Sequence, residues 1–197
     1  MHQNFLPDSQ DHVSPRQGRA HTDHRVRDDV RTPGYRGGMV TLRPWRDEDR
    51  PLLDAFNTPA MTAHLVAAES TDELDRRHQR YLKDDLPGRM LVIVDGSDAV
   101  GSIGYWEVHE ETGDIVWETG WSVLPAHQGH GFAALAVREL LAVVRADGRH
   151  DEIHAYPSVD NAPSNALCAR AGFTLRETRR FPFRGGELVV NDWAMTL

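Results

Sequence analysis

From Met39 onward, hydrophobic positions recur with a period of either two or about 3.6 residues, which predicts strands interleaved with helices. The period of two predicts about seven strands, at 40–45, 90–94, 100–108, 115–123, 153–156, 173–181 and 188–196. The helical period predicts four helices, at 47–57, 70–85, from Gly131 to about 147, and at 163–171. This order predicts a mixed α/β fold with a mostly antiparallel sheet and one parallel crossover.

Capping residues mark the starts of several predicted helices. Asp47 is placed to cap the first helix, and Ser70 to Glu73 has the sequence of a capping box. Asn161 is a favoured cap for the fourth helix. Leu124-Pro125 ends the strand at 115–123, because proline has no N–H to give to a sheet.

Residues 1–38 lack any apolar period and are rich in His, Asp, Arg, Pro and Gly, which predicts a disordered tail. Some of the chain's 11 histidines lie there, at spacings that match no metal-ligand motif. They are His2, His12, His21 and His24. Residues 39–197 are then expected to form a single domain around one hydrophobic core.

Composition narrows the classes of function. A net charge of −8 argues against a nucleic-acid-binding surface and is compatible with a basic acceptor such as an amine. No apolar run approaches the roughly 18 residues of a membrane span, and the polar N-terminus predicts no signal peptide. The single cysteine, Cys168, excludes an internal disulfide and fits a reducing, cytoplasmic compartment. Its helical spacing among small apolar residues predicts a packed side chain rather than a nucleophile.

A glycine-rich segment separates the strand at 115–123 from the next helix. It reads Gln128-Gly129-His130-Gly131-Phe132-Ala133. A helix N-terminus offers N–H donors and partial positive charge, and glycine lets an anion approach the backbone, so the segment is suited to phosphate. A tight turn that needs glycine only for its geometry is the alternative.

Two known phosphate motifs fit this segment less well. A P-loop requires GxxxxGK[ST], and the only lysine of the chain is Lys83. Residues 129–134 match the dinucleotide fingerprint, which expects an acidic residue at the end of the following strand. Asp151 and Glu152 instead come at the start of that strand, and the preceding strands read as hairpins. Both motifs are therefore set aside.

The pattern Gln128-x-x-Gly131-x-Ala133, directly after a strand, resembles the acetyl-CoA-binding signature of the GNAT N-acetyltransferase superfamily. Residues 160–165, followed by Ala171-Gly172-Phe173, resemble its next segment. The N-x-x-S form and the Glu118-x-Gly120 pair resemble the ribosomal-protein N-acetyltransferase subgroup in particular. The resemblance covers about residues 40–197. It implies the GNAT fold, in which the central strand at 115–123 and the fifth strand splay apart.

The resemblance also implies acetyl-CoA as cofactor and the residues that hold it. The pyrophosphate is assigned to the backbone of Gln128, Gly129, His130, Gly131, Phe132 and Ala133. The pantetheine arm is assigned to the backbone of Trp121, Val123 and Leu124 and to the side chain of Asn161. Gln128 has an alternative role as a turn residue. No metal is expected, because the HxxH pair of His127 and His130 has no apparent third ligand.

Two side chains are candidates for the chemistry. The resemblance implies that Ser164 points at the thiol and stabilises or protonates the thiolate. The alternative is that Ser164 is an ordinary serine in the first turn of a helix. Glu118 is the candidate base, because a carboxylate within an apolar strand is costly unless paired or functional, and burial raises its pKa toward a useful range. Its alternatives are an ion pair with an arginine, or orientation of the amine. Glu107, His109 and Glu110 are the reserve bases.

These features predict an acetyl-CoA-dependent N-acetyltransferase. Its acceptor would be a primary amine, on a protein N-terminus or a small molecule, that attacks directly in a ternary complex. No acyl-enzyme is expected, because the only cysteine reads as structural. A non-catalytic acyl-CoA-binding or sensor domain of the same fold is the alternative. We expect a monomer or a homodimer.

Overall fold

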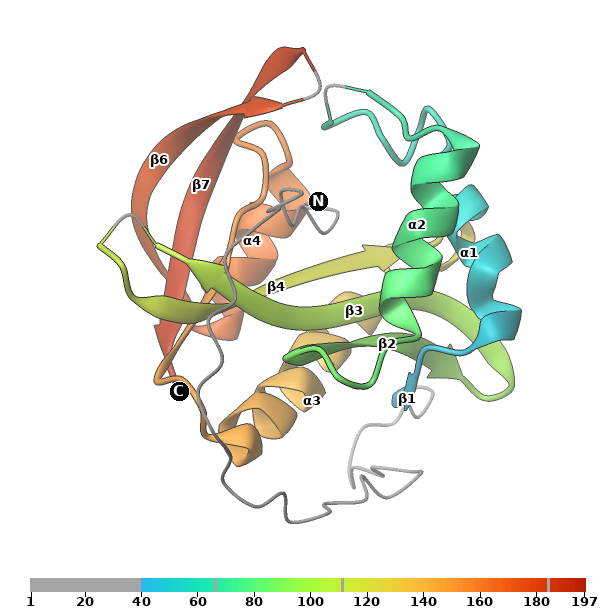
Figure 1. The fold of residues 1–197 in the computed structure, drawn as a ribbon, viewed down its shortest axis with the longest axis horizontal. Coiled ribbons are helices and arrows are strands. Elements are labelled where there is room, and N and C mark those ends of the chain that lie inside the picture. The colour runs from blue at the N-terminus through green and yellow to red at the C-terminus, as the bar shows by residue number, and fades with distance from the viewer. Residues whose placement is uncertain (1–39, 66, 111, 184) are drawn as a thin grey trace.

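The computed structural model describes residues 40–65, 67–110, 112–183 and 185–197, and these form a seven-stranded sheet flanked by helices (Figure 1). The predictions for the tail at 1–38, for Met39, and for the turn residues Glu111 and Arg184 lie outside the described residues.

Most element boundaries agree with the predicted periods. The strands are β1 (Val40–Pro44), β2 (Gly88–Asp95), β3 (Asp98–His109), β4 (Ile115–Val123), β5 (Glu152–Ala155), β6 (Thr174–Phe183) and β7 (Gly186–Thr196). The α-helices are α1 (Arg50–Phe56), α2 (Thr71–Tyr81), α3 (Phe132–Asp147) and α4 (Ala162–Ala171). Two short 3₁₀ turns, η1 (Asp47–Asp49) and η2 (Pro125–His127), precede α1 and α3.

The order of strands in the sheet is β1-β2-β3-β4-β5-β7-β6. Every neighbouring pair is antiparallel except β4 and β5, which run parallel because α3 crosses between them. The predicted mixed sheet with one parallel crossover is therefore confirmed.

Helices cover both faces of the sheet. The larger core lies on the α3 side, where Leu140 packs in one cluster with Trp117 of β4. A smaller core on the other face joins Leu53 of α1 and Leu74 of α2 to Val92 of β2. In Figure 1 the α1–α2 pair and the β6–β7 hairpin rise on opposite sides of β4. In this view β4 therefore lies between elements that come early and late in the described part of the chain.

The first helix begins later than the sequence predicts, and Asp47 is not its cap. Asp49 occupies that position instead, and its carboxylate accepts hydrogen bonds from the Arg43 guanidinium (2.6 Å) and the Arg46 N–H (2.8 Å). Asp47 contacts Nε2 of His78 at 3.1 Å. The capping box at Ser70 is confirmed.

Cys168 is fully buried in the larger core, as its spacing predicted. Burial raises the pKa of its thiol to about 12, so the thiolate does not form near neutral pH. Among the described residues, no helix is both long and apolar enough to cross a membrane.

Candidate active site at the splay of β4 and β5

Strands β4 and β5 are neighbours over only two residue pairs. Trp117 pairs with Ile153, and Glu118 pairs with His154. Beyond Glu118, β4 continues to Val123 in register with β3, while β5 ends at Ala155. The edge of β4 that faces β5 is therefore not covered by a strand after residue 118, which is the splay that the resemblance implied.

The backbone of β4 alternates between its two edges. The N–H of Leu124 donates to the Val100 carbonyl at 2.9 Å, and the Leu124 carbonyl accepts from the His127 N–H at 2.8 Å. Because successive residues of a strand direct their backbone groups to opposite edges, Trp121 and Val123 direct theirs toward the splay. A pantetheine arm can pair with Trp121 and with the N–H of Val123, whose carbonyl already accepts from the Gln128 side chain at 2.9 Å, whereas both backbone groups of Leu124 have partners within the chain. We therefore drop Leu124 from the predicted cofactor site.

The glycine loop, residues 128–133, leads into the N-terminus of α3. Gly129 and Gly131 have φ values of +79° and +82°, which residues with a side chain rarely adopt. A Cβ at either glycine would meet no atom within 4 Å, so backbone conformation and not crowding requires glycine. Gly131 is the N-cap of α3, with no side-chain capping bond and no acidic residue in the first turn. The N–H groups at this helix start are therefore left for an external anion.

Gln128 has the turn role that the sequence left as its alternative. Its side-chain Nε2 donates to the Val123 carbonyl at 2.9 Å, and its backbone N–H donates to the Pro125 carbonyl at 3.3 Å. The side-chain amide and the backbone N–H of Gln128 therefore stabilise the turn between β4 and α3. Of the predicted phosphate ligands, Gly129, His130, Gly131, Phe132 and Ala133 remain.

A cavity of about 540 Å³ runs along the splay from the glycine loop to α4. Its lining brings together most of the predicted cofactor residues, namely Trp121, Val123, Gln128, Gly129, Gly131, Phe132, Ala133, Asn161 and Ser164. Sequence reasoning missed Met61, His64 and Arg170, which also line it. They come from the segment after α1 and from α4, and no local motif marks them.

Asn161 and Ser164 are both buried at the start of α4. The Asn161 Oδ1 accepts the backbone N–H of Ser164 at 3.2 Å, which confirms Asn161 as the cap of this helix. Ser164 also lines a second, smaller hollow with Gly120, Trp121 and Tyr156. It is thus shared between the larger cavity and a hollow on the β4–β5 splay.

Glu118 is 6% exposed and lies in the middle of β4. Burial raises the pKa of its carboxyl to about 8; the Trp106 side chain opposes the shift, and the carboxylates of Glu110 and Asp192 add to it. A carboxyl with this pKa is partly ionised near neutral pH and still basic enough to accept a proton.

The reserve bases are placed less favourably. Glu107 stands opposite Trp117 in the β3–β4 register, so its side chain lies on the other face of the sheet from Glu118, where it contacts Nε2 of His150 at 2.7 Å. His109 is exposed at the end of β3. Glu110 accepts hydrogen bonds from the Tyr156 hydroxyl and the Arg179 guanidinium.

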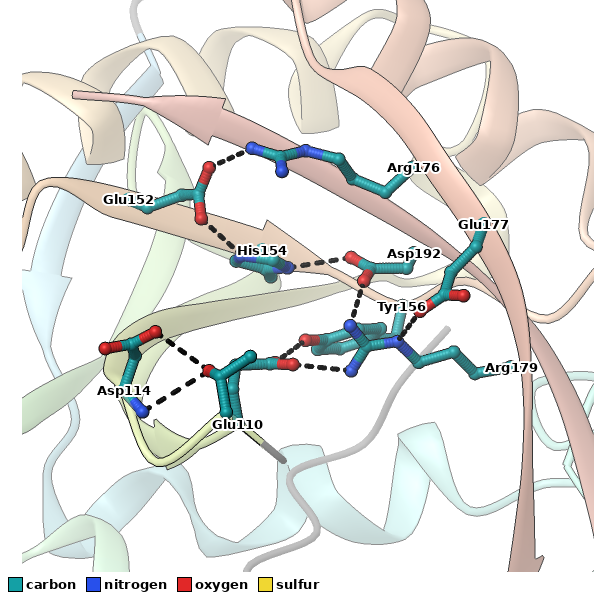
Figure 2. Close-up of polar contacts among 10 residues, drawn as sticks. Glu110, Asp114, Glu152, His154, Tyr156, Arg176, Glu177, Arg179 and Asp192 are labelled. Carbon is teal, nitrogen blue, oxygen red and sulfur yellow. Dashed lines mark hydrogen bonds and ion pairs between the residues drawn. The ribbon is translucent and has the colours of Figure 1, made fainter.

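A polar network lies on the Glu118 face of the sheet, and Figure 2 shows its members. We define it as Glu110, Glu152, His154, Tyr156, Arg179 and Asp192. Arg179 of β6 contacts Glu110 and the fully buried Asp192, each at 2.7 Å. Asp192 in turn contacts Nδ1 of His154 at 2.7 Å, and the Tyr156 hydroxyl donates to Glu110 at 2.6 Å. Apart from Glu110, a reserve base, sequence reasoning missed this network, because its members lie far apart in the chain.

The residues present fit acetyl-CoA. The cavity is bordered by strand edges that can pair with amide groups and by an uncapped helix start that can hold phosphate. Within the described part of the chain, no three His, Cys, Asp or Glu side chains are grouped to hold a metal ion.

Comparisons with solved structures identify the same fold. An acetyltransferase from Salmonella typhimurium that modifies the N-terminal serine of ribosomal protein L7/L12 superposes with a TM-score of 0.66 at 19% identity, over 80% of this chain and 95% of that one. A spermidine N-acetyltransferase from Vibrio cholerae, in complex with CoA and spermine, gives 0.66 at 21% identity, over 80% and 95%. A putative acetyltransferase, yncA, from Salmonella typhimurium, with acetyl-CoA, gives 0.66 at 21% identity, over 80% and 93%.

A comparison of the sequence with curated proteins gave no match. The model of one protein family, described as an acetyltransferase (GNAT) domain, matches residues 39–174. That range spans the glycine loop, the splay of β4 from β5 and the start of α4, which are the parts that form the cavity. On this evidence the chain belongs to the GNAT acetyltransferase family.

Proposed function

We propose that this protein transfers an acetyl group from acetyl-CoA to a primary amine, by direct attack of the amine within a ternary complex. The observation that carries the proposal is the parting of β4 from β5 directly after Glu118, beside a cavity that ends at an uncapped helix start. Acetyl-CoA, when bound, supplies the thioester that the amine attacks.

The chain's residues divide the work between binding and proton transfer. The backbone of residues 129–133 holds the pyrophosphate, and Trp121 and Val123 pair with the pantetheine arm. Glu118 accepts a proton from the attacking amine as the C–N bond forms and the C–S bond breaks. Ser164 supplies a hydrogen bond or a proton to the departing thiolate. Positioning supports these steps, because oriented reactants can reach effective molarities of about 10⁵–10⁸ M.

Cys168 supports the direct mechanism. Its thiol is fully buried in the core beneath α3 and its pKa is raised to about 12, so it is not a nucleophile for an acyl-enzyme. A fully buried thiol is also compatible with the reducing cytoplasm, which we propose as the compartment.

The acceptor is proposed as a primary amine, on a protein N-terminus or a small molecule. Two solved structures of the same fold support this range, since one modifies an N-terminal serine and the other is named for spermidine. The net charge of −8 is compatible with cationic acceptors of either kind.

Thiol release tests the proposal directly. The protein is incubated with acetyl-CoA and a panel of amines that includes spermidine, peptides with free N-terminal Ser, Ala or Met, and a lysine derivative with a blocked α-amine. We expect amine-dependent release of CoA thiol with at least one member. Tight acetyl-CoA binding without thiol release on any amine would contradict the proposal and favour a non-catalytic acyl-CoA sensor.

A further inference from the structure

Tyr156 follows the end of β5 and lies on the same face of the sheet as Glu118. His154 pairs with Glu118 across the β4–β5 junction, and side chains two residues apart in extended chain share a face. Tyr156 lies two residues after His154, and the rings of these two residues stack at 5.7 Å. It also lines the hollow that contains Gly120 and Ser164. Because Gly120 carries no side chain, the ring borders the open space of this hollow, into which Ser164 also faces.

The proton of the Tyr156 hydroxyl is committed to a carboxylate. The hydroxyl donates to Oε1 of Glu110 at 2.6 Å, and Arg179 donates to Oε2 of the same carboxylate at 2.7 Å. Burial alone would raise the pKa of Glu110, but these two donors hold it below its ordinary value, so the carboxylate stays ionised and can only accept. Tyr156 therefore does not serve as the proton donor for the thiolate. Its phenol oxygen can still accept a hydrogen bond.

Arg179 holds this arrangement in place. It contacts Glu110 at the end of β3 and Asp192 in β7, and its guanidinium lies 5.7 Å from the Tyr156 ring centroid. Asp192 is completely buried and also contacts His154, on which the Tyr156 ring stacks. Buried charges of this kind are costly unless each has a partner, so the network is sensitive to the loss of any one of its charged members. Figure 2 shows Arg179 between Glu110 and Asp192, beside the ring.

A primary amine that attacks a carbonyl carbon carries two N–H bonds besides the lone pair it uses. Glu118 accepts one of them and takes that proton as the C–N bond forms. The second N–H needs an acceptor in a site from which water is excluded, since an unsatisfied buried donor is costly.

We propose that the phenol oxygen of Tyr156 accepts the second N–H of the attacking amine, and that Arg179 and Asp192 are positioning residues for it. This inference rests on the proposed acetyltransferase function and adds a reason for preferring primary amines. In the balanced step the amine nitrogen bonds to the acetyl carbon, one amine proton goes to Glu118, and the C–S bond breaks with its electron pair on sulfur. The Ser164 hydroxyl stabilises the departing thiolate by a hydrogen bond. The second N–H stays on nitrogen and becomes the amide N–H of the product.

The test compares an amine with its N-methyl derivative. The best acceptor of the amine panel is assayed beside the same compound with one N-methyl group, on the wild type and on Tyr156→Phe. Phenylalanine keeps the ring that stacks on His154 and removes only the hydroxyl. We expect kcat/KM for the primary amine to fall about 10-fold, the usual weight of one lost hydrogen bond, while the N-methyl amine loses at most about 2-fold. Acetyl-CoA affinity and Tm should stay close to wild type.

Arg179→Met tests the positioning role, with Arg180→Met as its matched control. Arg180 is the next residue of β6, is exposed, and pairs with Glu187 instead of the network. We expect Arg179→Met to lose the same preference for primary over N-methyl amine, Arg179→Lys to recover part of it, and Arg180→Met to keep it. A residue that only stabilises the fold would lower both rates together and leave the preference unchanged.

The outcomes separate this inference from the function on which it rests. One outcome is that the wild type turns over and Tyr156→Phe keeps the full preference for the primary amine. This outcome would overturn the role of Tyr156 and leave the acetyltransferase function unaffected. A wild type that binds acetyl-CoA and releases no thiol with any amine would overturn both. Because Tyr156→Phe removes one exchangeable hydroxyl and no packing, its result decides the matter even if Arg179→Met does not fold.

Discussion

On one side of the β4–β5 splay the chain presents backbone groups and glycines, and on the other it presents buried charged side chains. The glycine loop reaches its shape through positive φ values at Gly129 and Gly131 and an uncapped start of α3. The polar network does not arise from residues that are adjacent in the sequence. It depends on Arg179 meeting Glu110, 69 residues earlier in the chain, and Asp192 meeting His154, 38 residues earlier.

The difference matches what we propose that each side recognises. A phosphate group is the same in every CoA molecule, and a few N–H donors at a helix start suffice to hold it. An amine that must lose a proton needs acceptors in defined places, and these are side chains with tuned pKa values. The family model ends at residue 174, the first residue of β6, so two members of the network, Arg179 and Asp192, lie outside the matched range. We infer that the two sides can be disrupted separately by single substitutions.

The largest effect is expected at Glu118. Replacing it with glutamine keeps the shape and removes the charge and the basicity, so kcat should fall about 10²–10⁴-fold, the usual contribution of general acid–base catalysis. Acetyl-CoA affinity, measured by calorimetry, should stay near wild type. Glu139→Gln, at another largely buried carboxylate, is the control. A near-normal kcat in Glu118→Gln would mean that the amine arrives already neutral and needs no base.

A substitution at Gly131 is expected to have the opposite effect, because it should weaken acetyl-CoA binding and leave the polar network intact. Valine there must adopt a φ near +82° in space that is open in the protein, so strain and the added side chain at the phosphate position should weaken acetyl-CoA binding roughly 10- to 100-fold. Gly96→Val is a matched control, because Gly96 also has a positive φ of +61° and open space around its Cβ but lies in the β2–β3 turn. Equal affinity losses in the two variants would show that the loop is only a turn.

Ser164 lies where the two sides meet, and a smaller effect is expected. The alanine variant keeps the cap of α4, because Asn161 accepts the backbone N–H of Ser164 and not its hydroxyl. We expect kcat to fall about 10-fold, with Tm nearly unchanged. Ser158→Ala, at another buried serine near α4, should leave kcat as it is. A loss of Tm in Ser164→Ala that matches its loss of rate would identify an ordinary helix serine.

The smallest effect is on stability. Because the folded state raises the pKa of Glu118 to about 8, it keeps a proton that the unfolded chain releases at lower pH, from a carboxyl with an ordinary pKa of 4.5. Stability therefore falls as the pH rises between these two values. Glutamine does not titrate. The Tm of Glu118→Gln minus the Tm of the wild type should therefore increase by several degrees from pH 5 to pH 9. A Tm difference that does not change with pH would show that the carboxyl is not perturbed.

Local patterns were sufficient to predict most of the fold. The strand at Ile115–Val123, the capping box at Ser70 and the cap at Asn161 all follow from residues within one turn or one strand. The cap of the first helix was predicted wrongly as Asp47, because a 3₁₀ turn over Asp47–Asp49 precedes α1 and moves the start of the helix to Arg50. The sequence pattern does not distinguish this turn from the first turn of an α-helix.

The polar network could not be predicted, because strand periodicity says which face a residue takes and not which distant residue it meets. Arg179 lies in an edge strand whose residues are largely exposed, and nothing near it in sequence indicates a buried aspartate as partner. Glu118 is the intermediate case. Its position within an apolar strand predicted burial, whereas the contributions of Glu110 and Asp192 to its pKa required the structure.

The most direct test of the central claim is the pH dependence of kcat/KM in the wild type and in Glu118→Gln. It should use an acceptor whose amine pKa lies well above 9, so that ionisation of the substrate does not coincide with that of Glu118. The wild type should show a break near pH 8, below which the rate falls as Glu118 takes up a proton. Glu118→Gln should lose this break and retain only the one due to the amine. An unchanged break near pH 8 in the glutamine variant would contradict the assignment of Glu118 as the base.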